Sequence, residues 1–489
     1  MIQEAGTSGI VFPPGPDGTP SSRLAGTRIM AAALGALDAR HAQEALLEPR
    51  WRHAYPLHFR RLVEGAMASP EAALACARAG LDAAWENLVF ARAGGPPATL
   101  REASADAELG QALHSLKLAG EGAERPAPWQ VPLRGEMLSG APLAAKIDDW
   151  EARGVVEPSA AASLHRCLRH PEWFDLSDRN IVLLGAGSEA GPLQWLARWR
   201  ANIVAVDLAR APLWQRIAGV VAEGNARLVV PLRRSATADA ASMDWCENAG
   251  VDLLTEAPRV IGWLRGLAAE HGPLDIAALG YLDGERHVRL SLAMDMVQAA
   301  LCEADSRTSL AWMATPTDVF AVPEATARRA MAAYEERPVL QRGLEAPLRL
   351  ASGDRLFHPN VERIERSSSG LGWGLVDSLV VEQGPNYALA KRLQQWRALV
   401  ARAAGHRSVL NIAPSTTTAS VIKNPALAAG FAGAGAFDIE VFEPATTNAL
   451  MAALWVHDLR ADESAANPRS ALAHPHELFM DNACHGGLW

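Results

Sequence analysis

Several patterns that mark common protein classes are missing from this chain of 489 residues. No run of about 18 uncharged apolar residues occurs, so no membrane-spanning helix is expected. A segment dense in Lys and Arg is also absent. The net charge is -9 at pH 7, and both features argue against a nucleic-acid partner. The N-terminus lacks a basic region followed by an apolar run, so no signal peptide is expected.

Cysteine is scarce too, and its distribution argues against metal or disulfide frameworks. The five residues are Cys76, Cys167, Cys246, Cys302 and Cys484, and none forms a Cys-x-x-Cys pair. This usage favours a reducing compartment, and we expect a cytoplasmic protein. Histidines near the C-terminus, including His474, His476 and His485, fit no standard zinc spacing, so no metal is expected there.

Tyrosine and lysine are rare, with four of each, yet one pair stands four residues apart in Gly384-Pro385-Asn386-Tyr387-Ala388-Leu389-Ala390-Lys391. At the start of an amphipathic helix, this spacing places Tyr387 and Lys391 on one face. A positive charge near a phenol favours the phenolate and lowers its pKa. The pair therefore suits proton transfer to or from a hydroxyl or carbonyl oxygen.

The pattern along the chain predicts three parts. Residues 1–175 form a mostly helical N-terminal domain or extension, with Pro- and Gly-rich breaks, an Ala/Leu-rich helical run over 31–47 and a helix start at Ser69-Pro70-Glu71. Residues 176–460 form a nucleotide-binding domain, and residues 461–489 form a tail that packs on the domain or on a partner.

A strand, a Gly-rich turn, a helix and a second strand open the middle part. The first strand is 180–184, the turn is Gly185-Ala186-Gly187-Ser188-Glu189-Ala190-Gly191, and the second strand, 202–206, ends in Asp207. A helix with Leu193, Leu196 and Trp199 on one face is expected between them. Glycines let a backbone approach a pyrophosphate, a helix N-terminus offers free N–H groups, and the acid accepts from ribose hydroxyls. The candidate cofactor-binding residues here are Gly185, Gly187, Ser188, Ala190, Gly191 and Asp207.

Further strands are predicted at 226–230, 272–280, 309–314 and from residue 408, with helices between them at 213–223, 238–247, 257–270, 288–304 and 388–403. Alternating strands and helices predict an α/β fold with a doubly wound, Rossmann-type, mostly parallel sheet. Ligands of such sheets bind beyond the carboxyl ends of the strands. Thr315 and Thr317 follow one of these strands, and a hydroxyl there is well placed to hold a substrate oxygen.

In this order, the motifs resemble those of the short-chain dehydrogenase/reductase family. The resemblance rests on the Gly-rich turn at 185–191, Asp207, Gly-Pro-Leu-Asp-Ile at 272–276, Tyr387-x-x-x-Lys391, and the strand from Ser408 that runs into Ala413-Pro414-Ser415-Thr416. It covers about residues 178–460. An N-terminal helical extension and an insertion before the Tyr-x-x-x-Lys motif distinguish this chain from the family pattern.

The resemblance implies an oxidoreductase that uses NAD or NADP to interconvert an alcohol and a ketone. Tyr387 would be the general acid/base, and Lys391 would lower its pKa and hold the ribose. Cofactor contacts would also come from Leu279, Gly280, Pro414 and Thr416, and Asp207 favours NAD because a carboxylate repels a 2′-phosphate. The family's usual serine before the tyrosine is missing. We favour Thr315 in that role, and Thr317, Ser367–Ser369 and Ser378 are alternatives.

Two other functions fit the same Gly-rich turn: an S-adenosylmethionine-dependent methyltransferase and a non-catalytic dinucleotide-binding protein. The insertion, residues 318–383, leaves and re-enters at the carboxyl ends of strands, where long loops act as lids. We therefore expect a small-molecule substrate that is large or partly apolar. The family resemblance further implies a homo-dimer or homo-tetramer.

Overall fold

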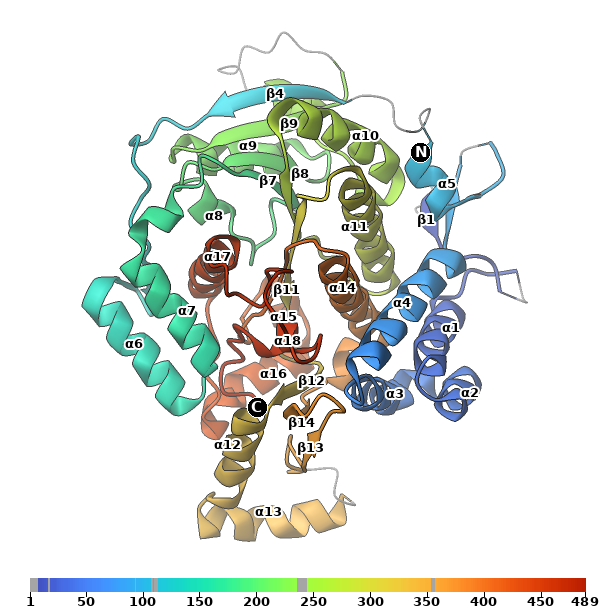
Figure 1. Cartoon of the computed structure of the whole chain (residues 1–489), viewed down its shortest axis with the longest axis vertical. Coiled ribbons are helices and arrows are strands. Elements are labelled where there is room, and N and C mark those ends of the chain that lie inside the picture. The colour runs from blue at the N-terminus through green and yellow to red at the C-terminus, as the bar shows by residue number, and fades with distance from the viewer. Residues whose placement is uncertain are drawn as a thin grey trace.

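The computed structural model describes residues 8–15, 18–92, 94–106, 109, 113–234, 244–352 and 357–489. The described chain has an α/β architecture around one sheet of seven strands (Figure 1). In spatial order these strands are β15 (Ser408–Ile412), β11 (Ser309–Ala314), β10 (Leu274–Ala278), β7 (Asn180–Leu184), β8 (Asn202–Val206), β9 (Arg227–Leu232) and β4 (His114–Ala119).

Six of the seven strands are parallel, and the edge strand β4 pairs with β9 in the antiparallel sense. The strands predicted at 180–184, 202–206 and 309–314 are confirmed to the residue. β4 was not foreseen. The strand order places β10 beside β7, with β8 on the other side of β7, so the crossover direction changes between β7 and β10. An α/β fold compatible with a Rossmann-like sheet is therefore confirmed.

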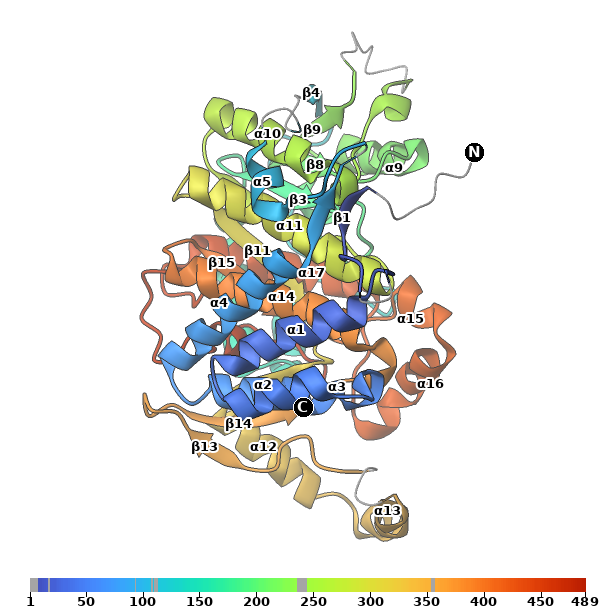
Figure 2. The ribbon, with the colours of Figure 1, turned by 90° about the vertical axis from the view of Figure 1, so that its right-hand side faces the viewer.

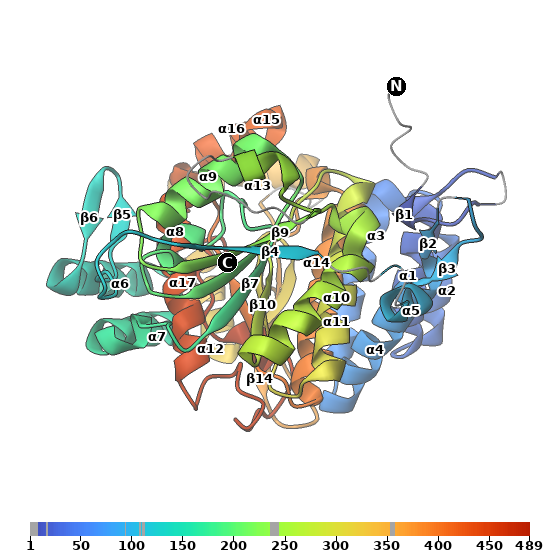
Figure 3. The ribbon, with the colours of Figure 1, turned by 90° about the horizontal axis from the view of Figure 1, so that it is seen from above.

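Helices cover both faces of the sheet, because successive strand residues point to opposite sides. In β7, Val182 and Leu184 belong to one apolar core, whereas Ile181 and Leu183 belong to the other. Figures 1 and 3 show the sheet between the two helical layers. On the first face lie α10 (Leu253–His271), α11 (Glu285–Ala304) and α14 (Pro385–Ala403), and on the second lie α6 (Gly140–Arg153), α7 (Pro158–Arg169), α9 (Ala211–Ala222) and α17 (Pro444–Arg460).

Residues of the N-terminal part pack on the first face. Its helices are α1 (Ser22–Gly35), α2 (Ala39–Leu47), α3 (Trp51–Ala66), α4 (Pro70–Asn87) and α5 (Leu100–Ala105), and a small sheet joins β1 (Gly9–Val11), β2 (Val89–Ala91) and β3 (Ala98–Thr99). In Figure 2, α1 and α4 lie in front of α14. Trp85 of α4 donates to Asp295 of α11 at 2.7 Å, and Arg397 of α14 binds the same carboxylate at 2.6 Å. This buried carboxylate joins three helices.

The Ala/Leu-rich helical run over 31–47 is helical in two pieces, because α1 ends at Gly35 and α2 begins at Ala39. The Asp38 carboxylate accepts from the amides of Arg40 and His41 and so starts a new helix. The helix start at Ser69 is confirmed, since its hydroxyl accepts from the amide of Ala72 at 3.1 Å.

The insertion forms its own small unit after β11. It consists of the antiparallel strands β12 (Val319–Pro323), β14 (Gly372–Asp377) and β13 (Ile364–Arg366) with the helices α12 (Glu324–Glu335) and α13 (Val339–Ala351) and the 3-10 turn η3 (Val381–Gln383). In Figure 1 this unit extends below the main sheet. The first helix of this unit, α12, begins directly after Pro323.

The remaining elements are short and lie mainly in loops. They are the hairpin β5 (Val131–Leu133) and β6 (Glu136–Leu138), the 3-10 turns η1 (Pro171–Phe174), η2 (Asp244–Asn248) and η4 (Ala434–Phe437), and the helices α8 (Leu193–Leu196), α15 (Ala419–Lys423), α16 (Pro425–Gly433) and α18 (Glu477–Met480). The helix predicted at 238–247 falls partly on residues outside the described chain, and its described end is η2. Among the described residues, no helix combines the length and apolar character that a bilayer crossing needs.

Candidate active site

Four loops meet beyond the carboxyl ends of the parallel strands. They follow β7 (185–192), β10 (279–284), β11 (315–318) and β15 (413–418). The first two touch closely: a Cβ added to Gly185, whose φ is +95°, would lie 2.6 Å from the Gly280 amide nitrogen. Leu279 also donates its amide to Leu184 at 2.9 Å. Gly185 on the first loop and Gly280 on the second, both predicted cofactor contacts, therefore lie side by side.

Tyr387 lies in the first turn of α14 beside the loop that follows β11. Its phenol lies near the Thr315 side chain, which acts to lower the pKa of the phenol. The Thr315 hydroxyl is in turn 2.8 Å from that of Thr317. Burial raises the pKa of the Tyr387 phenol to about 12, although Thr315 opposes this shift. The net direction is opposite to the lowered pKa that the sequence led us to expect, because loss of water outweighs the favourable neighbours.

Among the hydroxyl candidates, the favoured Thr315 acts on the Tyr387 phenol, and Thr317 is bonded to Thr315. The candidate serines lie elsewhere. Ser367 and Ser369 bond to each other at 2.7 Å, and the Ser368 amide donates to Ala68 at the α3–α4 corner. The Ser378 hydroxyl accepts from Asn360.

Lys391 follows Tyr387 by one turn, and its Nζ lies 5.9 Å from the centre of the Tyr387 ring. The amine makes one long contact, 3.5 Å to Oε1 of Gln394. Burial lowers its pKa from 10.5 to about 8, while the negative charge of Asp318 acts in the opposite direction. The lysine is thus a half-buried amine whose charge changes near neutral pH.

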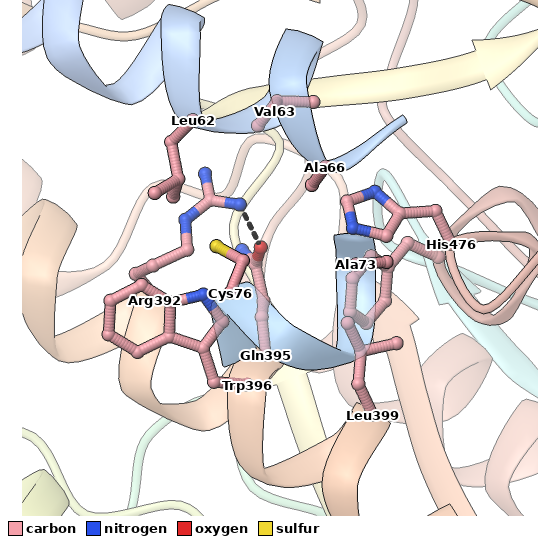
Figure 4. A pocket seen from close by; sticks show the side chains of 11 residues that line it. Leu62, Val63, Ala66, Ala73, Cys76, Arg392, Gln395, Trp396, Leu399 and His476 are labelled. Carbon is pink, nitrogen blue, oxygen red and sulfur yellow. Dashed lines mark hydrogen bonds between the residues drawn. The ribbon is translucent and has the colours of Figure 1, made fainter. Parts of the chain in front are cut away.

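A buried ion pair fixes the part of α14 that carries these side chains. Asp318 and Arg392 are 1 % and 2 % exposed, and their Oδ1 and Nη2 atoms are 2.9 Å apart. Gln395 donates to Oδ2 of Asp318 at 2.9 Å and accepts from Arg392 at 2.6 Å. Figure 4 shows Arg392 and Gln395 bonded to each other beside Cys76 and His476, in a cavity with room for about one water molecule. That cavity is too small for a substrate, so we assign it to the anchoring of α14.

Two further rings complete the surroundings of Tyr387, and sequence reasoning missed both. His287, from the start of α11, stacks on Tyr387 with centroids 5.6 Å apart and planes at 24°. Tyr281, from the loop after β10, lies 4.8 Å from His287 and 6.2 Å from Tyr387. We call Tyr281, His287 and Tyr387 the ring cluster. Because Tyr281 is the residue after Gly280, the cluster joins the tyrosine to the Gly-rich turn.

The Gly-rich turn keeps only part of its backbone free. The amides of Gly185 and Ala186 donate to Val206, that of Gly187 donates to Asp207 at 2.7 Å, and those of Ser188 and Gly191 close turns. Within the described chain, the amides of Glu189 and Ala190 and the Ser188 hydroxyl have no partner. Arg216 donates to the Gly187 carbonyl at 2.8 Å and brings a positive charge to the turn. These donors and this charge fit a phosphate group.

The helix expected after this turn differs from the structure. α8 has only four residues, Leu193–Leu196, so Trp199 lies outside it and no extended helix points at the turn. Pro192 precedes the helix, residues 197–200 form turns after it, and Arg200, with φ +59°, lies shortly before β8.

Asp207 stands where the sequence placed it, after β8, but its oxygens are partly used. Oδ2 accepts from the Gly187 amide and Oδ1 from the Leu208 amide, each at 2.7 Å. Burial raises its pKa, against the two backbone hydrogen bonds and the nearby charges of Arg216 and Arg210. One lone pair on each oxygen remains for a ribose hydroxyl.

The loop after β15 closes the site from the other side. Thr416 bonds to the Pro414 carbonyl and to the Thr447 hydroxyl, at 2.8 and 2.7 Å. The amide of Ala419 donates to the Glu189 carboxylate of the Gly-rich turn at 2.9 Å. The candidates Pro414 and Thr416 thus belong to a loop that touches the Gly-rich turn.

The tail, residues 461–489, packs on the same region. The Cys484 amide donates to Ile412 at the end of β15, and Trp489 contacts the Pro316 carbonyl. Across the described residues, no three His, Cys, Asp or Glu side chains are grouped to hold a metal ion.

The geometry defines the class of protein as an α/β protein with a Rossmann-like sheet and a polar site at its carboxyl edge. Comparison with known proteins adds nothing more specific, since no family model and no curated protein matches the chain.

Proposed function

We propose that this protein is an oxidoreductase that uses NAD or NADP to interconvert an alcohol and a ketone. The observation that carries the proposal is the Tyr387 phenol, which lies beside Thr315 and has the amine of Lys391 5.9 Å from its ring centre. A phenol in this setting can donate a proton to a carbonyl oxygen or take one from a hydroxyl. The proposal treats the sheet as doubly wound and residues 1–175 as a helical extension of the nucleotide-binding domain.

The dinucleotide supplies or accepts the hydride when it is bound. Ser188 and the free amides of Glu189 and Ala190 would hold its phosphates, and the Asp207 carboxylate would accept from the adenosine ribose. Asp207 favours NAD, while Arg216 and Arg210 offer a positive charge that a 2′-phosphate would need. Leu279, Gly280, Pro414 and Thr416 would line the bound cofactor.

The chain's own groups explain proton control at the substrate oxygen. The Thr315 hydroxyl fixes the direction of the phenol, because it is itself held by Thr317. The Lys391 ammonium stabilises a phenolate, so it lowers the cost of proton loss from Tyr387 in the transition state. The insertion lies directly after β11, and we propose that it covers a large or partly apolar substrate.

Cofactor titration and a single substitution test the proposal. NADH, NADPH and S-adenosylmethionine are titrated against the protein, followed by tryptophan fluorescence, and turnover is measured with a panel of alcohols and ketones. We expect a nicotinamide cofactor to bind and Tyr387→Phe to lower kcat by about 10²–10⁴-fold without weakening cofactor binding.

The matched control is Tyr334→Phe, which removes a phenol oxygen that donates to the Phe357 carbonyl in the insertion. It should keep wild-type turnover. Binding of S-adenosylmethionine alone would favour a methyltransferase and refute the proposal. Binding of NAD(H) without turnover of any alcohol or ketone would favour a non-catalytic dinucleotide-binding protein.

A further inference from the structure

His287 is a buried polar side chain without a partner. Its side chain is 1 % exposed, and neither ring nitrogen has a hydrogen-bond partner among the groups that the structure describes. Buried polar atoms in folded proteins are nearly always bonded, so each exception needs an explanation. Packing alone does not require an imidazole here, because phenylalanine would fill the same place against Tyr281 and Tyr387.

The surroundings of His287 indicate the protonation state of its imidazole. Burial lowers the pKa of His287 well below 6.5, and the positive charge of Lys391 lowers it further. The ring is therefore neutral at pH 7, with one N–H donor and one bare nitrogen acceptor. Lys391 itself has only the 3.5 Å contact with Gln394. Lys391 is near enough for its charge to act on this imidazole, and both side chains lie against the Tyr387 ring.

We propose that His287 is a positioning residue of this site: its bare ring nitrogen accepts a hydrogen bond through one water molecule that the Lys391 ammonium binds, and so holds that amine beside Tyr387. The consequence for catalysis rests on the proposed function, whereas the pairing itself does not. The stack between His287 and Tyr387, with planes at 24°, keeps the imidazole fixed while its edge stays free for this bond.

The other groups around Lys391 do not replace this bond. Tyr387 lies on the same helix, and its phenol interacts with Thr315. Asp318, from the loop after β11, raises the pKa of Lys391, but its oxygens are held by Arg392, Gln395 and the Val319 amide. Tyr281, from the loop after β10, donates to Asp283. His287, by contrast, has two ring nitrogens without a partner in the described chain.

Competitive acylation across pH, read by mass spectrometry, tests the pairing. The chain has four lysines, so Lys117, Lys146 and Lys423 serve as internal references for Lys391. We expect Lys391 to titrate near 8 in the wild type. Loss of the acceptor in His287→Phe should lower this midpoint by about one pH unit, because the ammonium loses a water-mediated hydrogen bond. His287→Gln, which keeps an acceptor oxygen, should restore the midpoint towards the wild-type value.

His58→Phe is the matched control, since His58 is also 1 % exposed, has no hydrogen-bond partner in the described chain, and stacks on Trp51. It should leave the Lys391 midpoint unchanged. If His287→Phe does not fold, His287→Leu gives the same comparison. Equal midpoints in the wild type and the apolar variant, or no recovery in His287→Gln, would overturn the inference.

Turnover separates this inference from the proposed function, because the labelling needs no substrate. If alcohols are oxidised, the alkaline limb of the kcat profile should move with the Lys391 midpoint in His287→Phe and return in His287→Gln. A shifted midpoint in a protein that turns over no alcohol or ketone would uphold the pairing and refute the oxidoreductase. Turnover of an alcohol or ketone, together with an unchanged Lys391 midpoint in His287→Phe, would support the oxidoreductase and refute the pairing.

Discussion

The ion pair between Asp318 and Arg392 allows a quantitative prediction, because both side chains are almost fully buried and their bonds are known. Asp318 accepts three hydrogen bonds, from Arg392 and Gln395 at 2.9 Å each and from the Val319 amide at 2.7 Å. Arg392→Met removes the cation and leaves a buried carboxylate that two neutral donors hold. Removing one partner of such a pair costs about 3–5 kcal/mol of the free energy of unfolding.

Asp318→Leu should cost a similar amount, because it leaves the arginine without a counter-ion. The double variant removes both charges, so it should lose less than the sum of the two, with a coupling free energy of about 1–3 kcal/mol. The methionine also has space, since Arg392 borders the small cavity of Figure 4. The four proteins of the cycle are unfolded in urea and followed by tryptophan fluorescence.

The matched control is an exposed pair on the surface, Lys117 and Glu270, whose charged atoms are 2.9 Å apart. Lys117→Met should change the free energy of unfolding by less than about 1 kcal/mol, because water screens exposed charges. Strictly additive costs in the Asp318–Arg392 cycle, or single-variant costs as small as that of Lys117→Met, would refute the argument that this pair fixes α14.

Two further predictions concern Lys391 and the Gly-rich turn. Because burial lowers the Lys391 pKa to about 8, the folded protein binds fewer protons than the unfolded chain between pH 8 and 10.5. Its charge therefore destabilises the fold below about pH 8, and this penalty fades as the pH rises towards 10.5. Lys391→Met should stabilise the fold at pH 7 by about 1–3 kcal/mol and flatten that pH dependence of urea unfolding; an unchanged slope would contradict the assigned shift. Gly185→Ala should destabilise the fold more than Gly135→Ala. Both glycines have positive φ, but only at Gly185 would the added Cβ meet backbone, at Gly280. Equal melting temperatures for the two variants would show that the loops after β7 and β10 are loosely packed.

The sequence determined the local elements because their signals are local. Five-residue apolar runs between polar residues marked β7 and β8, and a serine before a proline and a glutamate marked the start of α4. The helical repeat alone was enough to predict that Tyr387 and Lys391 share one helix face, and α14 contains both residues. Asp207 follows β8 as its position in the chain required.

Elements that depend on distant partners were missed or misjudged. None of the six residues of β4 is buried, and it is a strand because β9 lies beside it. The α8 helix ends at Leu196 and residues 197–200 form turns, whereas apolar spacing alone predicted a longer helix. The direction of the Tyr387 pKa was wrong because the sequence shows a neighbouring charge but not the loss of water around it.

The composition of the site was decided by tertiary structure. The sequence favoured Thr315 among several hydroxyl residues, and packing of α14 against the end of β11 brings Thr315 to Tyr387. Nothing in the sequence marks His287, which meets Tyr387 only because α11 and α14 lie side by side on one face of the sheet. Helix caps and apolar periodicity can be recognised from neighbouring residues in the sequence. The burial of a side chain, its hydrogen-bond partner and its pKa depend instead on groups that are far apart in the sequence. The sequence therefore determined the two residues of the Tyr-x-x-x-Lys pair, and the fold decided what surrounds them.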